Sequence, residues 1–294
     1  MSSDVSVVVV TWNSLATIER CLDSVRGHKT IVVDNGSTDA TAAFVAEHFP
    51  EVTLIRQENR GMGAGNNTGI RAASGRYLFL LNADAWVVGD GLEALVARAE
   101  ANPRCAVVGP RLRNPDGTAQ RSIRGDPTLW RLATEYLYLR KLAPNSRLLN
   151  AFYGGGRSVE REQEVESLYG AALLVRAAAA EQIGLFDERF FMFSEETDWL
   201  YRFRQAGWSV LYSPLAEVVH VGGASHGGAL YIENLRGILR FLDKHRGRSA
   251  AERARRLLRC ALALRGALYR GERGERYRAG ARFLASGSTP TLLQ

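Results

Sequence analysis

The stretch YLFLLNADAWV, residues 77–87, starts as a buried strand and ends on polar side chains. Tyr77 to Leu81 are apolar enough for the centre of a parallel sheet. Asn82 and Asp84 then follow, one residue apart. A turn would explain them, because Asn and Asp side chains satisfy backbone groups where strands stop. A ligand site would also explain them, because open α/β sheets bind ligands at the carboxyl ends of their strands.

Strands and helices alternate on both sides of this stretch. Apolar and β-branched runs predict further strands at 5–10, 30–33, 52–55 and 105–112, and helices that end near residues 25, 48, 70 and 101. Alternation of this kind over roughly 110 residues is typical of a parallel sheet with crossover helices. The sequence therefore predicts an α/β fold with a doubly wound, mostly parallel sheet flanked by helices.

The pattern is weaker beyond residue 125. It predicts a helix at 128–142, a polar loop at 143–165, a strand at 167–176, a helix at 195–206 and closing strands at 210–212 and 217–221. From Tyr231 onward the spacing is that of amphipathic helix. We predict a domain over residues 1–230 and a basic helical tail over 231–294.

The composition is that of a soluble globular protein, with 46% hydrophobic and 23% charged residues in a chain of 294. No apolar run approaches the roughly 18 residues of a membrane span. The cysteines Cys21, Cys105 and Cys260 are widely separated and form no metal-binding pattern. We expect them to be small core residues in a reducing, cytoplasmic compartment.

Polar groups stand at several predicted strand ends and at one predicted helix start. They are Thr11, Asn13, Asp34, Asn82, Asp84 and His220 at strand ends, and Glu195, Glu196 and Asp198 at the helix start. Each alone could be a turn residue, a cap or a favourable charge at a helix dipole. A parallel sheet brings its carboxyl ends to one edge, so their number favours a ligand site there.

Motifs of other nucleotide-binding and hydrolytic enzymes are missing from the sequence. GMGAG at 61–65 has the glycines of a dinucleotide fingerprint, but such a fingerprint follows the first strand, where this chain has TWNS. There is no Walker lysine motif and no G-x-S-x-G elbow. A dehydrogenase of the dinucleotide-binding type is therefore excluded.

Several ordered motifs point to one family. They are VSVVVVTWNS, IVVDNGSTDAT, ENRGMGAGNNTGIRAASGRYLFLLNADA, GPRLRNPDG, GAALLVR, GLFDERFFMFSEETDWLYRFRQAGW and HVGGAS. In them the chain resembles the inverting glycosyltransferases of family 2, which have the GT-A fold. It is most similar to the bacterial branch that includes rhamnosyltransferases. The resemblance covers roughly residues 4 to 228.

The resemblance implies a nucleoside-diphosphate sugar donor and a divalent cation, Mg²⁺ or Mn²⁺. The D-x-D motif of the family falls on Asn82-Ala83-Asp84, so only Asp84 can be a charged metal ligand. Asn82 is left to contact the ribose or a metal-bound water. The position of His220 implies a second metal ligand, and its imidazole suits Mn²⁺.

The resemblance also implies a nucleotide pocket at the first strand ends. Trp12 offers a flat face for a pyrimidine, and Thr11 and Asn13 offer hydrogen bonds. Asp34 is placed to accept the N3–H of uracil or thymine, which favours a dTDP- or UDP-sugar. Asn67 and Arg71, on the helix after the glycine-rich turn, are candidate phosphate or ribose contacts.

A base must take the acceptor's proton if inversion proceeds by one displacement. The family places this base second in an acidic pair at a helix start, which here is Glu196, after Glu195. Asp198 is the alternative base, and Glu195 is expected to position the sugar.

Two other classes of protein remain as alternatives. One is a nucleotidyltransferase, although TWNSLAT lacks the basic loop expected of that class after the first strand. The other is a non-catalytic nucleotide-sugar-binding protein.

The tail has a strong positive charge. Residues 236–282 contain fifteen Lys or Arg against four Asp or Glu, a net +11, and because the whole chain carries +7 the rest carries −4. Basic amphipathic helices bind anionic membrane surfaces. A solvated helix packed on the main domain and an acidic protein partner are the alternatives. Nucleic acid is not predicted, because aromatic residues do not alternate with the basic ones.

The family resemblance also bears on the partners. Its acceptors are often sugars linked to polyprenyl diphosphate, so we expect a lipid-linked or polysaccharide acceptor in cell-wall or surface glycan synthesis. Rhamnose is the favoured sugar, and galactofuranose, glucose and N-acetylglucosamine are the alternatives. A cytoplasmic enzyme resting on the inner face of the cell membrane fits this role, and a homo-oligomer is compatible with it.

Overall fold

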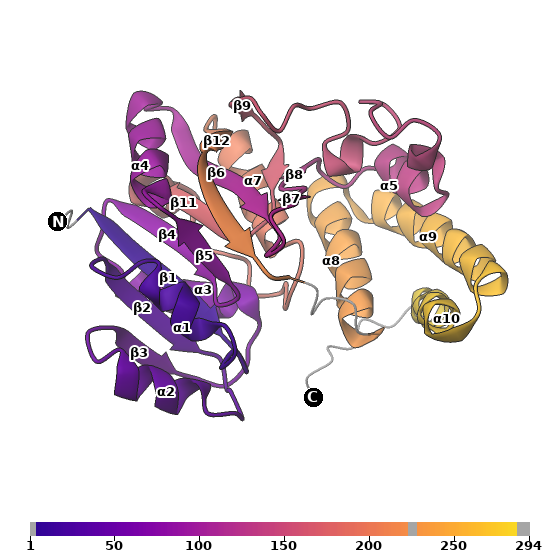
Figure 1. The fold of residues 1–294 in the computed structure, drawn as a ribbon. Helices are drawn as coiled ribbons and strands as arrows, with labels where there is room; N and C mark the ends of the chain where they lie inside the picture. The colour runs from indigo at the N-terminus through magenta and orange to yellow at the C-terminus, as the bar shows by residue number, and fades with distance from the viewer. Residues whose placement is uncertain (1–3, 223–227, 287–294) are drawn as a thin grey trace. The chain divides into compact units, whose positions relative to one another are not determined.

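The computed structural model describes residues 4–222 and 228–286 (Figure 1). Contacts within the chain divide it into two compact units. The first, here called the sheet unit, comprises residues 1–124, 158–191 and 195–222. The second, here called the helical unit, comprises residues 125–157, 192–194 and 223–294.

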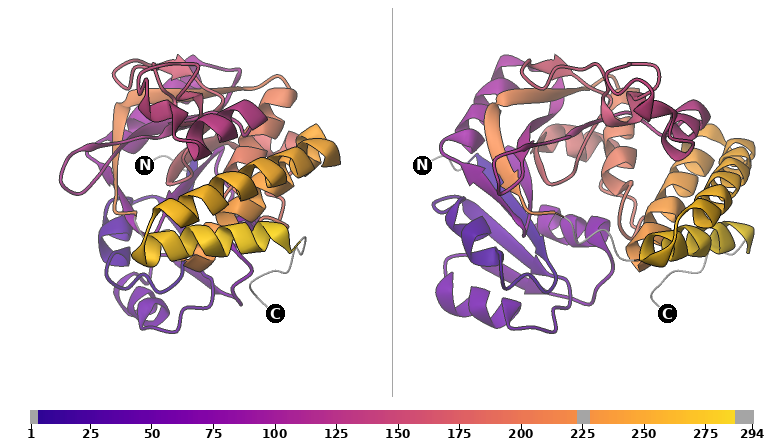
Figure 2. Two further views of the ribbon diagram at one scale, coloured as in Figure 1. Left: turned by 90° about the vertical axis from the view of Figure 1, so that its right-hand side faces the viewer. Right: turned by 45° about the vertical axis from the view of Figure 1, so that its right-hand side comes forward.

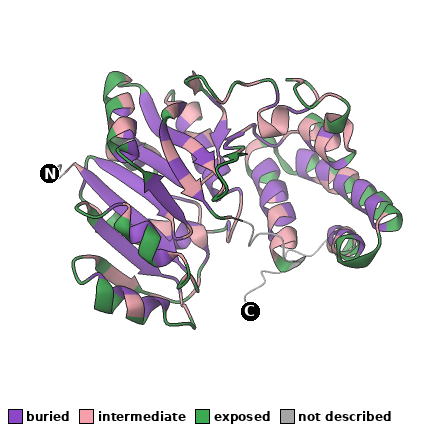
Figure 3. Ribbon diagram, viewed as in Figure 1, coloured by how far each residue is buried: buried purple, intermediate pink, exposed green. Residues whose placement is uncertain are grey.

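The first half of the sheet unit is a parallel sheet in the order β3-β2-β1-β4. Its strands are β1 (Val5–Thr11), β2 (Lys29–Asp34), β3 (Thr53–Arg56) and β4 (Tyr77–Asn82). The helices between them are α1 (Ile18–Asp23), α2 (Thr41–His48) and α3 (Met62–Ala72). Strands β1, β2 and β4 are buried along most of their length (Figure 3), as apolar runs in a doubly wound sheet should be, whereas the edge strand β3 is partly exposed.

The second half makes the sheet mixed. The order continues β11-β6-β12-β5, with β11 (Ala172–Arg176) antiparallel to both neighbours and β6 (Cys105–Arg113) parallel to β12 (Ser209–His220). The remaining elements are β5 (Ala85–Val88), β7 (Ala119–Gln120), β8 (Ile123–Arg124), β9 (Gln163–Glu164), β10 (Ser167–Leu168), α4 (Gly91–Ala101), α6 (Ala177–Ile183) and α7 (Glu195–Gln205). The predicted α/β architecture, a mostly parallel sheet with helices around it, is confirmed.

Two strand predictions need correction. The strand predicted over 167–176 is interrupted, because β10 pairs with β8 whereas β11 pairs with β4 and β6. The two closing strands predicted near 210 and 217 are one strand, β12, whose pairing shifts between Ser213 and Glu217. Pro214 lies in this shift and has no N–H to donate to a sheet ladder.

The glycine-rich stretch after β3 serves close packing. A Cβ atom added at Gly65 would lie 2.7 Å from Cγ1 of Val10, and one added at Gly69 would lie 2.3 Å from Cγ1 of Val8. Only glycine therefore lets α3 approach β1 this closely. This packing accounts for the glycines without a dinucleotide.

The helical unit consists of short turns and three long helices. Its elements are α5 (Leu129–Tyr136), η1 (Leu139–Lys141), η2 (Ala151–Tyr153), α8 (Gly228–Arg246), α9 (Arg248–Leu268) and α10 (Gly271–Ala285). Figure 2 shows α8, α9 and α10 lying together. The helix predicted over 128–142 thus ends at Tyr136. None of the described helices is both long and apolar enough to cross a membrane.

Some basic residues of the tail are core residues of the helical unit. Arg265 is only 6% exposed, donates from Nη2 to the carbonyl of Glu135 and lies 3.8 Å from the centre of the Tyr138 ring. Its charge is therefore not available to a membrane surface. Cys260, predicted to be a core residue, is instead exposed, whereas Cys21 and Cys105 are buried as predicted.

Candidate active site

The register of the parallel strands brings three predicted site residues to one edge of the sheet. Thr11, the last residue of β1, is aligned with Asp34, the last residue of β2. On the other side of β1, Val10 is aligned with Asn82, the last residue of β4. The three strands end within one residue of each other, so their polar ends form one surface, as expected for a switch point in an open α/β sheet.

Thr11 and Asp34 are buried with spare hydrogen-bonding capacity. Each is 1% exposed, and neither Thr11 Oγ1 nor Asp34 Oδ1 has a hydrogen-bond partner in the described parts of the chain. The other carboxylate oxygen of Asp34 lies 3.9 Å from Nε of Arg56. Buried polar atoms are normally paired. A carboxylate oxygen and a hydroxyl that both lack a partner, on aligned residues of neighbouring strands, therefore indicate a place for a ligand.

Asn13 connects two loops. Its backbone is in the left-handed region (φ 51°), and its Oδ1 accepts hydrogen bonds from the backbone N–H of Thr38 (2.7 Å) and Asp39 (3.2 Å). Its own N–H donates to Oγ of Ser37. The adjacent Trp12 is 56% exposed, which leaves its ring face open for stacking. Asn13 thus holds the loop that presents Trp12.

Asn67 and Arg71 of α3 both contact Glu188, a residue to which the sequence analysis gave no role. The amide of Asn67 donates to the carbonyl of Phe186 and to Oε1 of Glu188, and its oxygen accepts from the N–H of Phe186. Arg71 and Arg60 flank the carboxylate of Glu188 at 3.5 and 2.7 Å. These bonds give Asn67 a structural task, and Arg71 stays partly exposed.

Asp84 and His220 meet at the ends of β4 and β12. His220 Nε2 lies 3.3 Å from Oδ1 of Asp84, whose other oxygen accepts from the N–H of Gly222. Burial raises the pKa of Asp84, but the hydrogen bond and charge of His220 and the Gly222 N–H outweigh it and lower the pKa below its usual range. Asp84 is therefore an anion at neutral pH.

Gln120, which the sequence analysis missed, holds the His220 ring. Its Oε1 lies 3.0 Å from Nδ1 of His220, and its Nε2 donates to the His220 carbonyl at 2.5 Å and to Asn114 Oδ1 at 2.6 Å. A carbonyl oxygen can only accept, so Nδ1 must carry the proton and Nε2 the lone pair in a neutral ring. Metal-binding histidines are usually fixed in this way.

The pair fits a divalent cation that needs few protein ligands. A carboxylate oxygen and Nε2 of His220 face each other, and a cation between them would take the place of a proton on Nε2. Mg²⁺ and Mn²⁺ sites in nucleotide enzymes take their remaining ligands from water and phosphate. In the described residues no group of three or more His, Cys, Asp or Glu side chains could hold a metal.

The acidic pair lies at the start of α7, after two strained residues. Phe193 and Ser194 both have positive φ angles (67° and 68°), which non-glycine residues adopt uncommonly and which cluster at active sites and ligand clamps. Glu195 and Glu196 are only 7% and 8% exposed. A Cβ added at Gly170 would be 3.4 Å from Cβ of Glu196, so Glu196 packs against the segment that leads into β11.

Gly170 connects this pair to the strand ends. The next residue, Ala171, accepts a hydrogen bond from the N–H of Asn82 at its carbonyl. The backbone between Gly170 and Ala171 thus joins Glu196 to the end of β4. The acidic pair and the strand ends belong to one part of the sheet unit.

The pKa of Glu195 is shifted by its surroundings. Burial raises the pKa of Glu195 well above its usual value, and the charge of Glu196 raises it further. Glu195 Oε2 has no hydrogen-bond partner within residues 4–222 and 228–286. Two neighbouring carboxylates in a buried site share one proton most easily, so Glu195 holds a proton more readily than an ordinary glutamate does.

Asp198 has a different setting from the pair. It is fully buried and accepts from Nε of Arg202 at 2.9 Å. Arg202 also donates to the carbonyls of Ile183 and Leu185, at 3.0 and 2.6 Å. These contacts tie α7 to the chain that follows α6, which is a structural role.

Comparison with known proteins places the chain in a family. Residues 6–162 match the model described as glycosyl transferase family 2. The chain is 33% identical over 244 residues to the N-acetylglucosaminyl-diphospho-decaprenol L-rhamnosyltransferase of Mycobacterium tuberculosis, covering 75% of this chain and 76% of that protein. It is 27% identical over 222 residues to the pre-mycofactocin glycosyltransferase of the same organism, covering 74% and 42%. The chain belongs to glycosyl transferase family 2 and is a glycosyltransferase, as its motifs predicted.

Solved structures confirm the fold. GalNAc-T7 with UDP, GalNAc and Mn²⁺ superposes with a TM-score of 0.60 at 18% identity, covering 81% of this chain and 47% of that one. The mannosyltransferase PcManGT from Pyrobaculum calidifontis, with GDP-Man and Mn²⁺, superposes with a TM-score of 0.57 at 18% identity, covering 96% and 84%. These likenesses show the predicted GT-A fold.

Proposed function

We propose that this glycosyltransferase inverts the anomeric centre of a dTDP- or UDP-sugar, with rhamnose as the favoured sugar. The observation that carries the proposal is the strand-end surface. It combines unsatisfied, buried Thr11 and Asp34 with the Asp84–His220 pair. The 33% identity to an L-rhamnosyltransferase supports rhamnose over other sugars.

The nucleotide base would bind at the ends of β1 and β2. Oδ1 of Asp34 is a buried acceptor without a partner in the described structure, and it suits the N3–H of thymine or uracil. Unprotonated cytosine has no such donor. The exposed ring of Trp12 would stack on the base, and the hydroxyl of Thr11 would complete the polar contacts.

Asp84 and His220 would hold the cation, and Asn82 would contact the ribose or a metal-bound water. The bound cation would neutralise charge on the leaving diphosphate. The Mn²⁺ in the two structural neighbours supports this choice. Gln120 would keep Nε2 of His220 unprotonated and aimed at the cation. Arg71 is a candidate phosphate contact, and the bonds of Asn67 favour a supporting role.

Glu196 would be the base of a single displacement. Its carboxylate accepts the proton of the acceptor hydroxyl while that oxygen forms a bond to the anomeric carbon. The bond from the anomeric carbon to the diphosphate oxygen breaks, and the nucleoside diphosphate leaves with the electron pair. Protonated Glu195 would donate a hydrogen bond to the sugar, and Asp198 would position α7 through Arg202.

The acceptor would be a lipid-linked or polysaccharide glycan of the cell wall or surface. The relative's N-acetylglucosaminyl-diphospho-decaprenol substrate supports a lipid-linked one. The exposed arginines of α9 and α10, within 236–282, would bring the enzyme to the inner face of the membrane from the cytoplasm. The domain would be the part before residue 231, with the basic tail after it.

A donor panel tests this function. Thermal shift and hydrolysis are measured with dTDP-rhamnose, UDP-galactofuranose, UDP-glucose, UDP-N-acetylglucosamine and GDP-mannose, each with and without Mn²⁺ or Mg²⁺. We expect metal-dependent stabilisation by a thymidine or uridine donor that is lost in Asp84→Ala. Stabilisation by GDP-mannose alone would refute the roles of Asp34 and Trp12. Binding without turnover would favour the non-catalytic alternative.

A further inference from the structure

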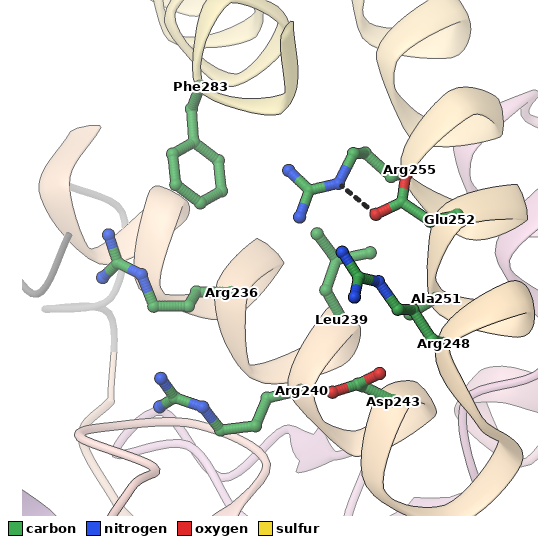
Figure 4. Close-up of a pocket in the computed structure, with 9 residues that line it drawn as sticks. All are labelled: Arg236, Leu239, Arg240, Asp243, Arg248, Ala251, Glu252, Arg255 and Phe283. Carbon is green, nitrogen blue, oxygen red and sulfur yellow. Dashed lines mark ion pairs between the residues drawn. The ribbon is translucent and has the colours of Figure 1, made fainter. Parts of the chain in front are cut away.

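A cavity lies within the helical unit, and none of its lining residues belongs to the strand-end surface. Its volume is about 350 Å³, at the lower end of the range for ligand pockets. It is lined by Arg236, Leu239, Arg240, Asp243, Arg248, Ala251, Glu252, Arg255 and Phe283 (Figure 4). All of these belong to α8, α9 or α10.

Positive charge dominates the lining. Four guanidinium groups line the cavity with only two carboxylates. Arg236 pairs with Glu233, and Nε of Arg255 lies 3.5 Å from Oε1 of Glu252. In Figure 4 the guanidinium groups of Arg248 and Arg255 lie next to each other beside Leu239. The lining thus carries more positive than negative groups, which favours an anion in the cavity.

Two donor atoms of the lining arginines are buried. Nη1 of Arg255 and Nε of Arg236 are inaccessible to solvent and have no hydrogen-bond partner in the described portion of the chain. Burial, followed by the nearby charge of Arg240, lowers the pKa of Arg236. Buried donors without acceptors are costly, and an anion in the cavity would reach these two atoms only if the side chains turned toward it.

The shape of the site favours an ester over a free ion. Arginine presents planar pairs of N–H donors that match phosphate oxygens. Leu239 and Phe283 add apolar surface to the same cavity, and Leu239 lies between the arginines in Figure 4. Inorganic phosphate would not use this apolar surface, whereas a diphosphate carrying an alkyl chain would use both parts.

We infer that this cavity binds the diphosphate group of an isoprenoid-linked acceptor. The inference rests on the proposed function, because a lipid-linked acceptor supplies such a diphosphate. The anionic headgroup of a phospholipid has related chemistry, and the experiment separates the two sources. Binding here needs no divalent cation, in contrast to the donor site.

The test is calorimetric titration of the full chain with farnesyl diphosphate in EDTA, so that no metal supports the donor site. The double variant Arg248→Gln/Arg255→Gln should bind about tenfold more weakly or worse, as the loss of charge-assisted hydrogen bonds predicts. The matched control Arg253→Gln/Arg259→Gln removes two exposed charges of α9 outside the lining and should bind within about twofold of wild type. Asp84→Ala should bind as wild type.

The outcomes are separable. Equal weakening in both double variants, or no binding of farnesyl diphosphate, would overturn the inference. Tighter binding to phosphatidylglycerol vesicles than to farnesyl diphosphate, with the same dependence on Arg248 and Arg255, would overturn the acceptor assignment in favour of a lipid headgroup. Arg248→Gln alone alters an exposed residue, so its effect does not depend on refolding of the helices. If the cavity does not bind a diphosphate, metal-dependent turnover of the donor should still be observed. If the protein does not use the proposed donor, farnesyl diphosphate should still bind.

Discussion

The sheet unit and the helical unit both bury polar groups, but by different means. In the sheet unit, strand register fixes where Thr11, Asp34 and Asn82 lie, because each ends a strand paired with its neighbour. In the helical unit, buried Arg236 and Arg265 are placed by the packing of helices and rings. Register can be inferred from a sequence pattern, whereas helix packing depends on contacts that the pattern does not contain.

The largest effect is expected from a substitution in the metal-binding part of the sheet unit. Asp84→Ala removes the carboxylate that faces His220 Nε2. We expect donor turnover to fall on the order of 10³-fold, since charge on the leaving diphosphate would lose its compensation. Steady-state hydrolysis of dTDP-rhamnose at saturating Mn²⁺ measures this. Activity within tenfold of wild type would exclude Asp84 as a metal ligand.

Removal of the base should separate chemistry from binding. Glu196→Gln keeps the shape of the side chain but cannot accept a proton, so transfer should fall about 10²- to 10⁴-fold while donor affinity changes little. Single-turnover transfer and donor titration are measured together. If Asp198→Asn instead lost transfer to this extent while Glu196→Gln remained active, Asp198 would be the base.

Gln120→Ala tests the orientation of His220. The variant loses the acceptor for Nδ1–H, so the metal concentration for half-maximal activity should rise roughly 10- to 100-fold while activity at saturating metal stays near wild type. Gln120→Glu retains an acceptor and should restore part of the affinity. An unchanged metal requirement in Gln120→Ala would show that Gln120 does not act through the cation.

Residue Gln120 also shows where prediction from the sequence reached its limit. Asp34, Asp84 and His220 stand at recognisable strand ends, so the pattern and the motifs could name them. Gln120 meets His220 across 100 residues of sequence and lies just outside the motif GPRLRNPDG, in a stretch that matches no motif named above. Its role depends on the pairing of β7 with β6 beside β12, which no local periodicity encodes.

The dependence of structure on strand pairing and helix packing also explains the other differences between prediction and structure. The break in 167–176 reflects two different pairing partners, β8 and β4, and not a change in residue type. Amphipathic spacing predicted helix from Tyr231 onward but not the burial of Arg265 among tyrosines. The positive charge of the tail suggested a surface, and part of it lies in the core.

Arg265→Leu tests whether the two units have separate roles. It removes a buried guanidinium that donates to the Glu135 carbonyl and stacks on Tyr138. We expect the helical unit to lose about 2 kcal/mol of stability, as for a hydrogen bond to a charged group. Chemical denaturation followed by circular dichroism measures the loss. Donor binding should not change, and a matching loss of donor affinity would contradict the separate roles of the units.

The smallest expected effect concerns Glu195. Its raised pKa means that the folded state binds a proton that the unfolded state releases above about pH 4.3. The stability contributed by this group is full below that pH and falls as pH rises toward the folded-state pKa. Glu195→Gln lacks this loss, so its melting temperature relative to wild type should rise from pH 4 to pH 8. A difference that is constant with pH would show that Glu195 is ionised in the folded protein.

The stereochemistry of transfer tests the account most directly. Transfer from dTDP-rhamnose with Mn²⁺ to an N-acetylglucosaminyl-diphospho-lipid analogue is followed by NMR of the new glycosidic bond. One displacement with Glu196 as base predicts an anomeric configuration opposite to that of the donor. Retention of the donor's configuration would contradict the proposed site, because it requires an intermediate that Glu196 does not provide in this account.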